Sequence, residues 1–149
     1  MDDDVPLETM NGWVDTVVSE GIWLMELWLD HDGNYAPPEE TIKSHFTYIS
    51  EQKTLWSATA NEAIKYIKER QNSTVSENKL KEGEFLVNIT DTLPDDIFDY
   101  PLSVKVNVPY GTKTVTVYQG KNYKQYSVSG TTAIVEIIPD KGYARIIAE

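Results

Sequence analysis

The densest group of side chains that could do chemistry is Glu26, Asp30, His31 and Asp32. An imidazole can act as a general acid or base, and carboxylates beside it can orient it or bind a divalent metal. His31 is therefore the candidate catalytic residue, with Asp30 and Asp32 as its partners. The alternative is a solvated turn, and these residues alone favour it, because Asp-His-Asp-Gly-Asn consists of turn-forming residues.

Tyrosines in the second half of the chain form another candidate site. A row of tyrosines on one face of a sheet could stack on saccharide rings, so Tyr118, Tyr123 and Tyr126 are candidate carbohydrate-binding residues. Ordinary cross-strand packing is the default interpretation of the same residues. All four tryptophans lie in the first half, where we expect core packing rather than sugar stacking: Trp13, Trp23, Trp28 and Trp56.

Other catalytic motifs are absent from the sequence. Two histidines exclude a three-histidine zinc site, and the lack of cysteine excludes disulfides, thiolate zinc sites and a cysteine nucleophile. The chain has no Gly-rich phosphate loop, Gly-x-Ser-x-Gly elbow or His-Glu-x-x-His pair. His45 lies on the inner stripe of a predicted helix, where we expect a satisfied, partly buried histidine rather than a ligand. We assign no metal ligand in this chain.

The elements that must position Asp30 to Asp32 alternate between helix and strand. Ile22–Leu29 is almost wholly apolar, which is typical of a strand covered on both faces in a parallel α/β sheet. Enzymes of that class place their chemistry beyond the carboxyl ends of such strands. The neighbouring predicted elements are a helix at Leu7–Glu20 ended by Gly21, a helix beginning at Pro38, a short strand at Thr54–Ser57 and a helix capped by Thr59.

The second half alternates apolar and polar residues with period two. Six short runs separated by turn signals predict a small antiparallel sandwich or barrel. These runs are residues 85–89, 102–108, 114–118, 123–128, 133–138 and 143–147. Residues 72–80 are polar and rich in turn formers, which indicates a linker. We therefore expect an α+β chain with an α/β piece at residues 1–71 and a β-sandwich at residues 81–149.

Charge and hydropathy restrict the partners. The chain of 149 residues has room for one ordinary domain or two small ones, and its net charge is −11. Residues 1–70 contribute −9 of this charge and residues 71–149 contribute −2. No cluster of Lys and Arg suits a phosphate backbone, so nucleic acid is excluded as a partner. The sequence has no apolar run long enough for a membrane span and no signal peptide.

Three stretches carry a family resemblance over residues 8 to 71. They are Gly21-Ile-Trp-Leu-Met-Glu-Leu-Trp followed by Asp-Gly, then Pro-Pro-Glu-Glu-Thr-Ile-Lys-Ser-His-Phe-Thr-Tyr-Ile, then Leu-Trp-Ser-Ala-Thr-Ala-Asn-Glu-Ala-Ile-Lys-Tyr-Ile-Lys-Glu-Arg70. In order and spacing they resemble the last part of a NodB-like polysaccharide deacetylase (carbohydrate esterase family 4). The resemblance implies a distorted (β/α) barrel that removes acetyl groups from chitin, peptidoglycan or xylan with a divalent metal such as zinc.

The resemblance extends to the second half and bears on location. The segment with Tyr100-Pro-Leu-Ser-Val-Lys-Val-Asn-Val108 resembles a β-sandwich appended to some secreted bacterial members of the family. An extracellular, periplasmic or cell-surface location is therefore expected for the intact parent protein. Its polymer substrate would be a polysaccharide.

The family's metal-binding motifs have no match here. Its early Asp-Asp, its His-x-x-x-His and its arginine motif would all lie upstream of Met1, so we expect no cofactor bound by this chain. Its final Leu-x-His motif aligns Leu29 with the catalytic histidine. His31 lies two positions further along and could substitute, because that spacing keeps the same strand face. Otherwise the chain is catalytically silent at this point.

Three functions follow as hypotheses. The first is the C-terminal fragment of a polysaccharide deacetylase, inactive by itself. The alternative is a non-catalytic carbohydrate-binding or cell-surface accessory module, and a third is a structural spacer. Strand Ile22–Leu29 also needs neighbours at both edges, which two helices and Thr54–Ser57 cannot supply. We therefore expect either a homo-oligomer formed through the incomplete sheet or packing of the sandwich against it.

Overall fold

A computed structural model describes residues 5–27 and 37–149, and the chain divides into two compact units at Ser57 and Ala58. The architecture is mixed α+β, with helices and antiparallel sheets. The expected β-sandwich is present, whereas the expected piece of a (β/α) barrel is not seen in the described residues. No described helix is long and apolar enough to cross a membrane.

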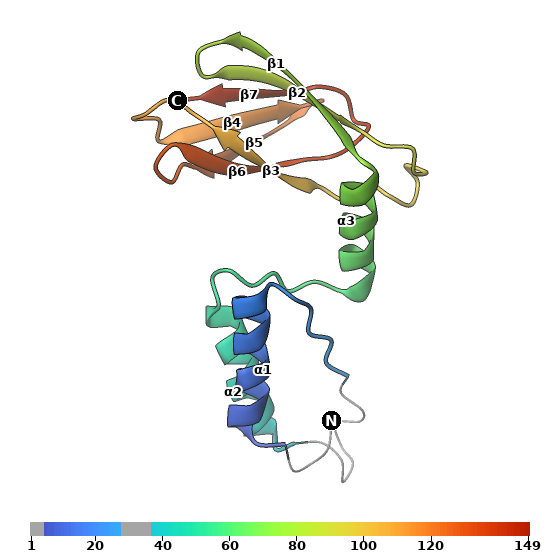
Figure 1. Cartoon of the computed structure of the whole chain (residues 1–149), viewed down its shortest axis with the longest axis vertical. Coiled ribbons are helices and arrows are strands. Elements are labelled where there is room, and N and C mark those ends of the chain that lie inside the picture. The colour runs from blue at the N-terminus through green and yellow to red at the C-terminus, as the bar shows by residue number, and fades with distance from the viewer. Residues whose placement is uncertain (1–4, 28–36) are drawn as a thin grey trace. The chain divides into compact units, whose positions relative to one another are not determined.

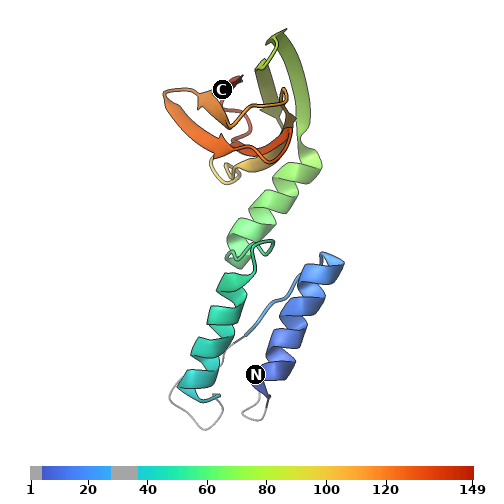
Figure 2. The same ribbon diagram turned by 90° about the vertical axis from the view of Figure 1, so that its left-hand side faces the viewer.

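The described part of the first unit is built on two helices, α1 (Leu7–Glu20) and α2 (Glu39–Glu51), which pack side by side (Figure 1, Figure 2). Met10 and Val14 of α1 are buried, as the spacing of apolar residues predicts. Gly21 ends α1 with a left-handed φ of 65°, and its N–H donates to the Val17 carbonyl oxygen at 2.9 Å. The predicted end of this helix is confirmed.

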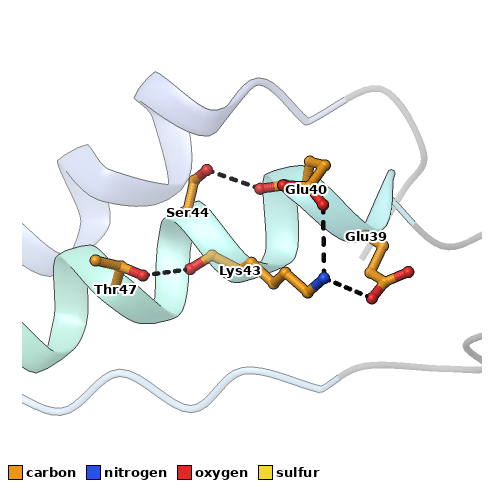
Figure 3. Close-up of polar contacts among 5 residues, drawn as sticks. All are labelled: Glu39, Glu40, Lys43, Ser44 and Thr47. Carbon is orange, nitrogen blue, oxygen red and sulfur yellow. Dashed lines mark hydrogen bonds and ion pairs between the residues drawn. The ribbon is translucent and has the colours of Figure 1, made fainter.

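Polar contacts join the two helices and stabilise α2 on its exposed side. The Tyr48 hydroxyl donates to Asp15 Oδ1 at 2.5 Å across the helix pair. Figure 3 shows Lys43 Nζ beside Glu39 and Glu40 in the first turns of α2, at 2.8 and 3.5 Å from their carboxylate oxygens. These exposed pairs satisfy one another locally and contribute at most a few tenths of a kcal/mol each.

The strand predicted at Ile22–Leu29 is wrong for the residues that are described. Residues 22–27 follow α1 outside any strand, and Thr54–Ser57 does not form a strand either. A strand requires a hydrogen-bonded neighbour, and residues 22–26 make no backbone hydrogen bond within the described part of the chain. The core packing expected of the tryptophans is also wrong for the three that are described, because their side chains are exposed: Trp13, Trp23 and Trp56.

The second unit begins with α3 (Ala60–Asn72), which opens with the predicted capping box. Glu62 N–H donates to Thr59 Oγ1 at 3.3 Å, and Thr59 N–H donates back to Glu62 Oε2 at 2.8 Å. These hydrogen bonds lower the pKa of the Glu62 carboxyl. The sequence prediction placed this helix in an α/β piece at residues 1–71, whereas the structure places it with the sandwich.

Seven strands follow α3. They are β1 (Thr74–Lys81), β2 (Glu84–Thr90), β3 (Leu102–Asn107), β4 (Thr114–Gln119), β5 (Asn122–Ser127), β6 (Thr132–Ile137) and β7 (Ala144–Ala148). Six of them match the runs predicted from the sequence. The seventh, β1, is a correction, because it occupies most of the linker predicted at residues 72–80. It is an edge strand exposed along its whole length, so it lacks the apolar alternation that marks a strand in a sequence.

The strands form a five-stranded sheet in the order β1-β2-β7-β4-β5 and a two-stranded sheet of β3 and β6, and all neighbours are antiparallel. The facing sides of these sheets supply one core. Its fully buried members include Ile89, Val115, Val135, Ile137 and Ile146. This core fixes which face of each strand points outward, and so it positions the surface side chains.

Glu69 ties α3 to the segment before β3. Its side chain is fully buried, Oε1 accepts a 2.7 Å hydrogen bond from the Tyr100 N–H, and Oε2 has no hydrogen-bond partner. Burial raises the pKa of the Glu69 carboxyl, and the charges of Asp91 and Asp99 add to the effect. The folded state therefore holds a proton on this group more tightly than the unfolded chain does.

We expect Glu69→Gln to stabilise the protein at neutral pH. The amide keeps an acceptor for Tyr100 N–H and removes a buried charge, so the free energy of unfolding should rise by about 1 kcal/mol. Because the native pKa is raised, the stabilising protonated form is lost as pH rises, and the gain should shrink at about pH 5 relative to about pH 8. Urea unfolding at both values measures this, with exposed Glu77→Gln as the control. A destabilised variant at about pH 8 would contradict the assignment.

We also expect the full chain to self-associate through residues 22–27. Met25 is 72% exposed and Leu27 is 67% exposed, and exposed contiguous apolar side chains favour association. The net charge opposes it, so association should increase with salt. Sedimentation velocity over a range of concentrations tests this with Met25→Gln/Leu27→Gln, which should restore a monomer. Val75→Gln, a matched exposed position on β1, should not, and a wild-type monomer at all concentrations refutes the expectation.

Candidate functional site

Of the two groups of candidate residues predicted from the sequence, the structure describes the tyrosines but not the Asp30–Asp32 group. Asp30, His31 and Asp32 lie outside the described residues, so their proposed catalytic role stays a prediction. Glu26, which was grouped with them, turns instead toward His45, at 2.9 Å between Oε1 and Nε2. Tyr118, Tyr123 and Tyr126 all lie in the sandwich, on β4 and β5.

His45 is buried as a structural residue. Its exposed fraction is 0%, its Nδ1 lies 2.8 Å from Asn11 Oδ1, and its Nε2 lies against Glu26. Both ring nitrogens are therefore engaged inside the first unit, where substrate cannot reach them. The expectation of a satisfied rather than a ligating histidine agrees with this geometry. Among the described residues, no three His, Asp or Glu side chains gather where they could hold a metal ion, so the metal implied by the family resemblance finds no site there.

Tyr118 and Tyr123 form a pair on the outer face of the five-stranded sheet. They lie directly opposite each other in the β4–β5 register, with ring centroids 5.9 Å apart and the rings tilted by 31°. Opposite residues of an antiparallel pair share a face, which explains the contact. Tyr118 is 41% exposed and Tyr123 is 71% exposed, so the two rings present aromatic surface to solvent.

Tyr126 does not join this pair. Three positions separate it from Tyr123, so the two side chains point to opposite faces of β5. Tyr126 pairs with Val115, packs against the core, and lies under the Lys124 ammonium, which is 5.3 Å from its ring centroid. The tyrosine row predicted on one face is therefore correct for two residues and wrong for the third.

An ion pair lies beside Tyr118, on the side away from Tyr123. Tyr118 lies opposite Arg145 of β7, whose guanidinium donates to Glu84 Oε1 at 2.6 and 2.7 Å. Lys81 Nζ lies 3.1 Å from Glu84 Oε2. Hydrogen bonds from Lys81 and Arg145 lower the pKa of the Glu84 carboxyl, so it stays ionised and holds Arg145 in place. This contact fixes the position of the side chain beside Tyr118.

A groove of about 590 Å³ lies along the edge strand β5, next to the tyrosine pair. This volume is in the usual range of ligand sites. The residues that line it come from the end of β4, from β5 and from the segments around β6: Pro101, Val117, Gln119, Gly120, Lys121, Asn122, Tyr123, Lys124, Tyr126, Glu136, Ile138 and Lys141. Tyr123 thus belongs to both the pair and the groove. The sequence reasoning missed the groove.

Two polar contacts bridge the sheets beside the groove. Lys124 Nζ of β5 lies 2.6 Å from Glu136 Oε2 of β6, and this hydrogen bond raises the pKa of Lys124. The Gln119 amide pairs with the backbone of Ile138, accepting from its N–H at 3.0 Å and donating to its carbonyl at 2.8 Å. Gln119 therefore substitutes for a neighbouring strand where the larger sheet ends.

Comparison with known proteins adds one similarity. No protein-family model matches the chain, and no solved structure matches it. A curated protein, a gellan lyase of Bacillus sp., is 24% identical over 108 residues. The match covers 64% of this chain and 4% of the relative, so the chain spans a small part of that protein. By its name the relative acts on a polysaccharide.

Proposed function

We propose that the residue 58–149 unit is a carbohydrate-binding module whose contact surface is the Tyr118/Tyr123 pair and the adjoining groove. The observation that carries this proposal is the exposed, side-by-side pair of aromatic rings on an outer sheet face. Two flat rings held by strand register offer apolar surface with hydroxyl groups at the rim, which suits the mixed apolar and polar faces of a sugar chain.

The similarity to gellan lyase supports this function over a spacer. Large apolar side chains on a surface lower solubility, so a pair of exposed aromatic rings beside a polar groove favours a ligand-binding role over a spacer role. The groove that Tyr123 borders is lined by amide and ammonium donors. Such groups orient a sugar and select among hydroxyl arrangements.

We expect Tyr118→Ala and Tyr123→Ala each to weaken polysaccharide binding by the full chain. Loss of one aromatic contact is worth about 1 kcal/mol, or about a fivefold rise in Kd. A glycan array selects the ligand, and calorimetry measures Kd. Tyr118→Phe keeps the ring and should bind nearly as wild type. Tyr110→Ala removes a tyrosine that is 95% exposed in a turn between β3 and β4, and it should have no effect.

A spacer role would show itself in the same experiment. Saturable binding to no glycan would refute the module, provided that circular dichroism confirms a folded sandwich. Binding that is lost equally in Tyr118→Ala and Tyr110→Ala would also contradict the assigned surface, because Tyr110 lies outside both the pair and the groove.

The deacetylase hypothesis predicts that this chain, assayed by itself, has no deacetylase activity. The parent enzyme's metal-binding motifs have no counterpart in this sequence, so we expect no acetate release from chitooligosaccharides or acetylxylan, with or without added Zn²⁺. An enzymatic acetate assay measures this directly. Metal-dependent turnover that disappears in His31→Ala would contradict the expectation and make His31 catalytic.

A further inference from the structure

The charges around the groove differ from those of the rest of the protein. The chain as a whole carries −11, yet the residues lining the groove include three lysines, Lys121, Lys124 and Lys141, and a single acid, Glu136. The groove is therefore a local positive site on an acidic protein. Such a distribution attracts anions to one place while the remaining surface repels them.

Only part of this positive charge is neutralised within the protein. Lys124 is paired with Glu136 at 2.6 Å and also lies over the Tyr126 ring. Its positive charge is therefore neutralised by the Glu136 carboxylate. Lys121 and Lys141 are exposed and form no ion pair with any described residue. Arg145, on the far side of Tyr118, is already held by Glu84. The two uncompensated cations of this region therefore belong to the groove.

Their positions relative to the tyrosines indicate what they would contact. Lys121 lies in the β4–β5 turn, between the two strands that carry the paired rings, and Lys141 lies in the segment between β6 and β7. The pair lies on the outer face of the sheet, whereas Tyr126 of the groove lies on its inner face, and Tyr123 borders both. A sugar chain stacked on Tyr118 and Tyr123 would therefore cross the β5 edge at Tyr123 to reach these ammonium groups. Lysine at such a place binds as a flexible point charge, which suits carboxylate or sulfate groups spaced along a polymer.

Resting on the carbohydrate-binding function proposed above, we propose that the groove is specific for an acidic polysaccharide, whose negative groups bind Lys121 and Lys141 while its sugar rings stack on Tyr118 and Tyr123. The neutral Lys124–Glu136 pair serves as a fixed wall between the two sheets. Recognition then has two separable parts, an aromatic part that depends on ring surface and an electrostatic part that depends on salt.

The test compares two oligosaccharides of equal length, an oligogalacturonate and a neutral cello-oligosaccharide, on the full chain by calorimetry. We expect the acidic probe to bind about tenfold more tightly at low salt, and this advantage should fall as salt is raised. A sulfated oligosaccharide as a third probe distinguishes carboxylate from sulfate as the preferred group. An oligothymidylate of similar charge is the control for a general anion surface. It carries phosphates but no pyranose rings to stack on the tyrosine pair, so it should bind more weakly.

Variants assign the effect to the two lysines. Lys121→Gln/Lys141→Gln should remove most of the preference for the acidic probe, so that the Kd values for the acidic and neutral probes become nearly equal. The matched control, Lys105→Gln/Lys113→Gln, makes the same charge change at exposed positions outside the groove and should keep the preference.

Each outcome supports or overturns the acidic specificity, the carbohydrate-binding function or both. Equal affinity for acidic and neutral probes overturns the acidic specificity and leaves the carbohydrate-binding function standing. Equal loss in both double variants overturns the role of the groove lysines, because net charge alone would explain it. Equally tight binding of the oligothymidylate indicates a general anion surface and overturns the saccharide specificity. Binding of no saccharide overturns both proposals together.

Discussion

The unequal width of the two sheets is the constraint on which the rest of the sandwich depends. Neighbouring strands lie roughly 4.8 Å apart, so a pair of strands covers much less area than five strands offer. The buried face of the larger sheet must be completed by other elements, or else be made of side chains that tolerate water. Tyr66 of α3 packs against the core at one place. At the β5 edge the solution is polar, with Lys124, Glu136 and Gln119 bridging the sheets, and the groove is the space that remains there.

This constraint also explains why the strands were predictable and the first unit was not. Runs such as 133–138 alternate because one face meets the core, and that pattern survives in the sequence whatever the topology. The apolar run at residues 22–27 carries no such information about its neighbours. The sequence predicts a doubly covered strand there because apolar residues usually imply burial, yet the apolar side chains of the run are exposed and residues 22–26 make no backbone hydrogen bond within the described part of the chain.

The tyrosine site was predictable to the extent that local geometry defines it. A two-residue turn at Gly120 and Lys121 places Tyr118 opposite Tyr123, and strand period alone places Tyr126 on the other face. The sequence therefore contained enough information to separate the third tyrosine from the pair. The groove was not predictable in this way, because Lys121, Glu136 and Lys141 meet only through the packing of β5 beside β6, which no local pattern encodes.

Charge placement connects the fold to the proposed ligand. An acidic protein that binds an acidic polymer must hold the polymer away from its own carboxylates, since like charges brought together without compensation oppose binding. Residues 1–70 carry nearly all of the net negative charge, whereas the sandwich is close to neutral. Within the sandwich, Lys124 is paired with Glu136 and Arg145 with Glu84, whereas Lys121 and Lys141 at the open edge of β5 form no ion pair with any described residue. The edge that two strands cannot cover thus also carries the two lysines proposed to bind an anionic sugar chain.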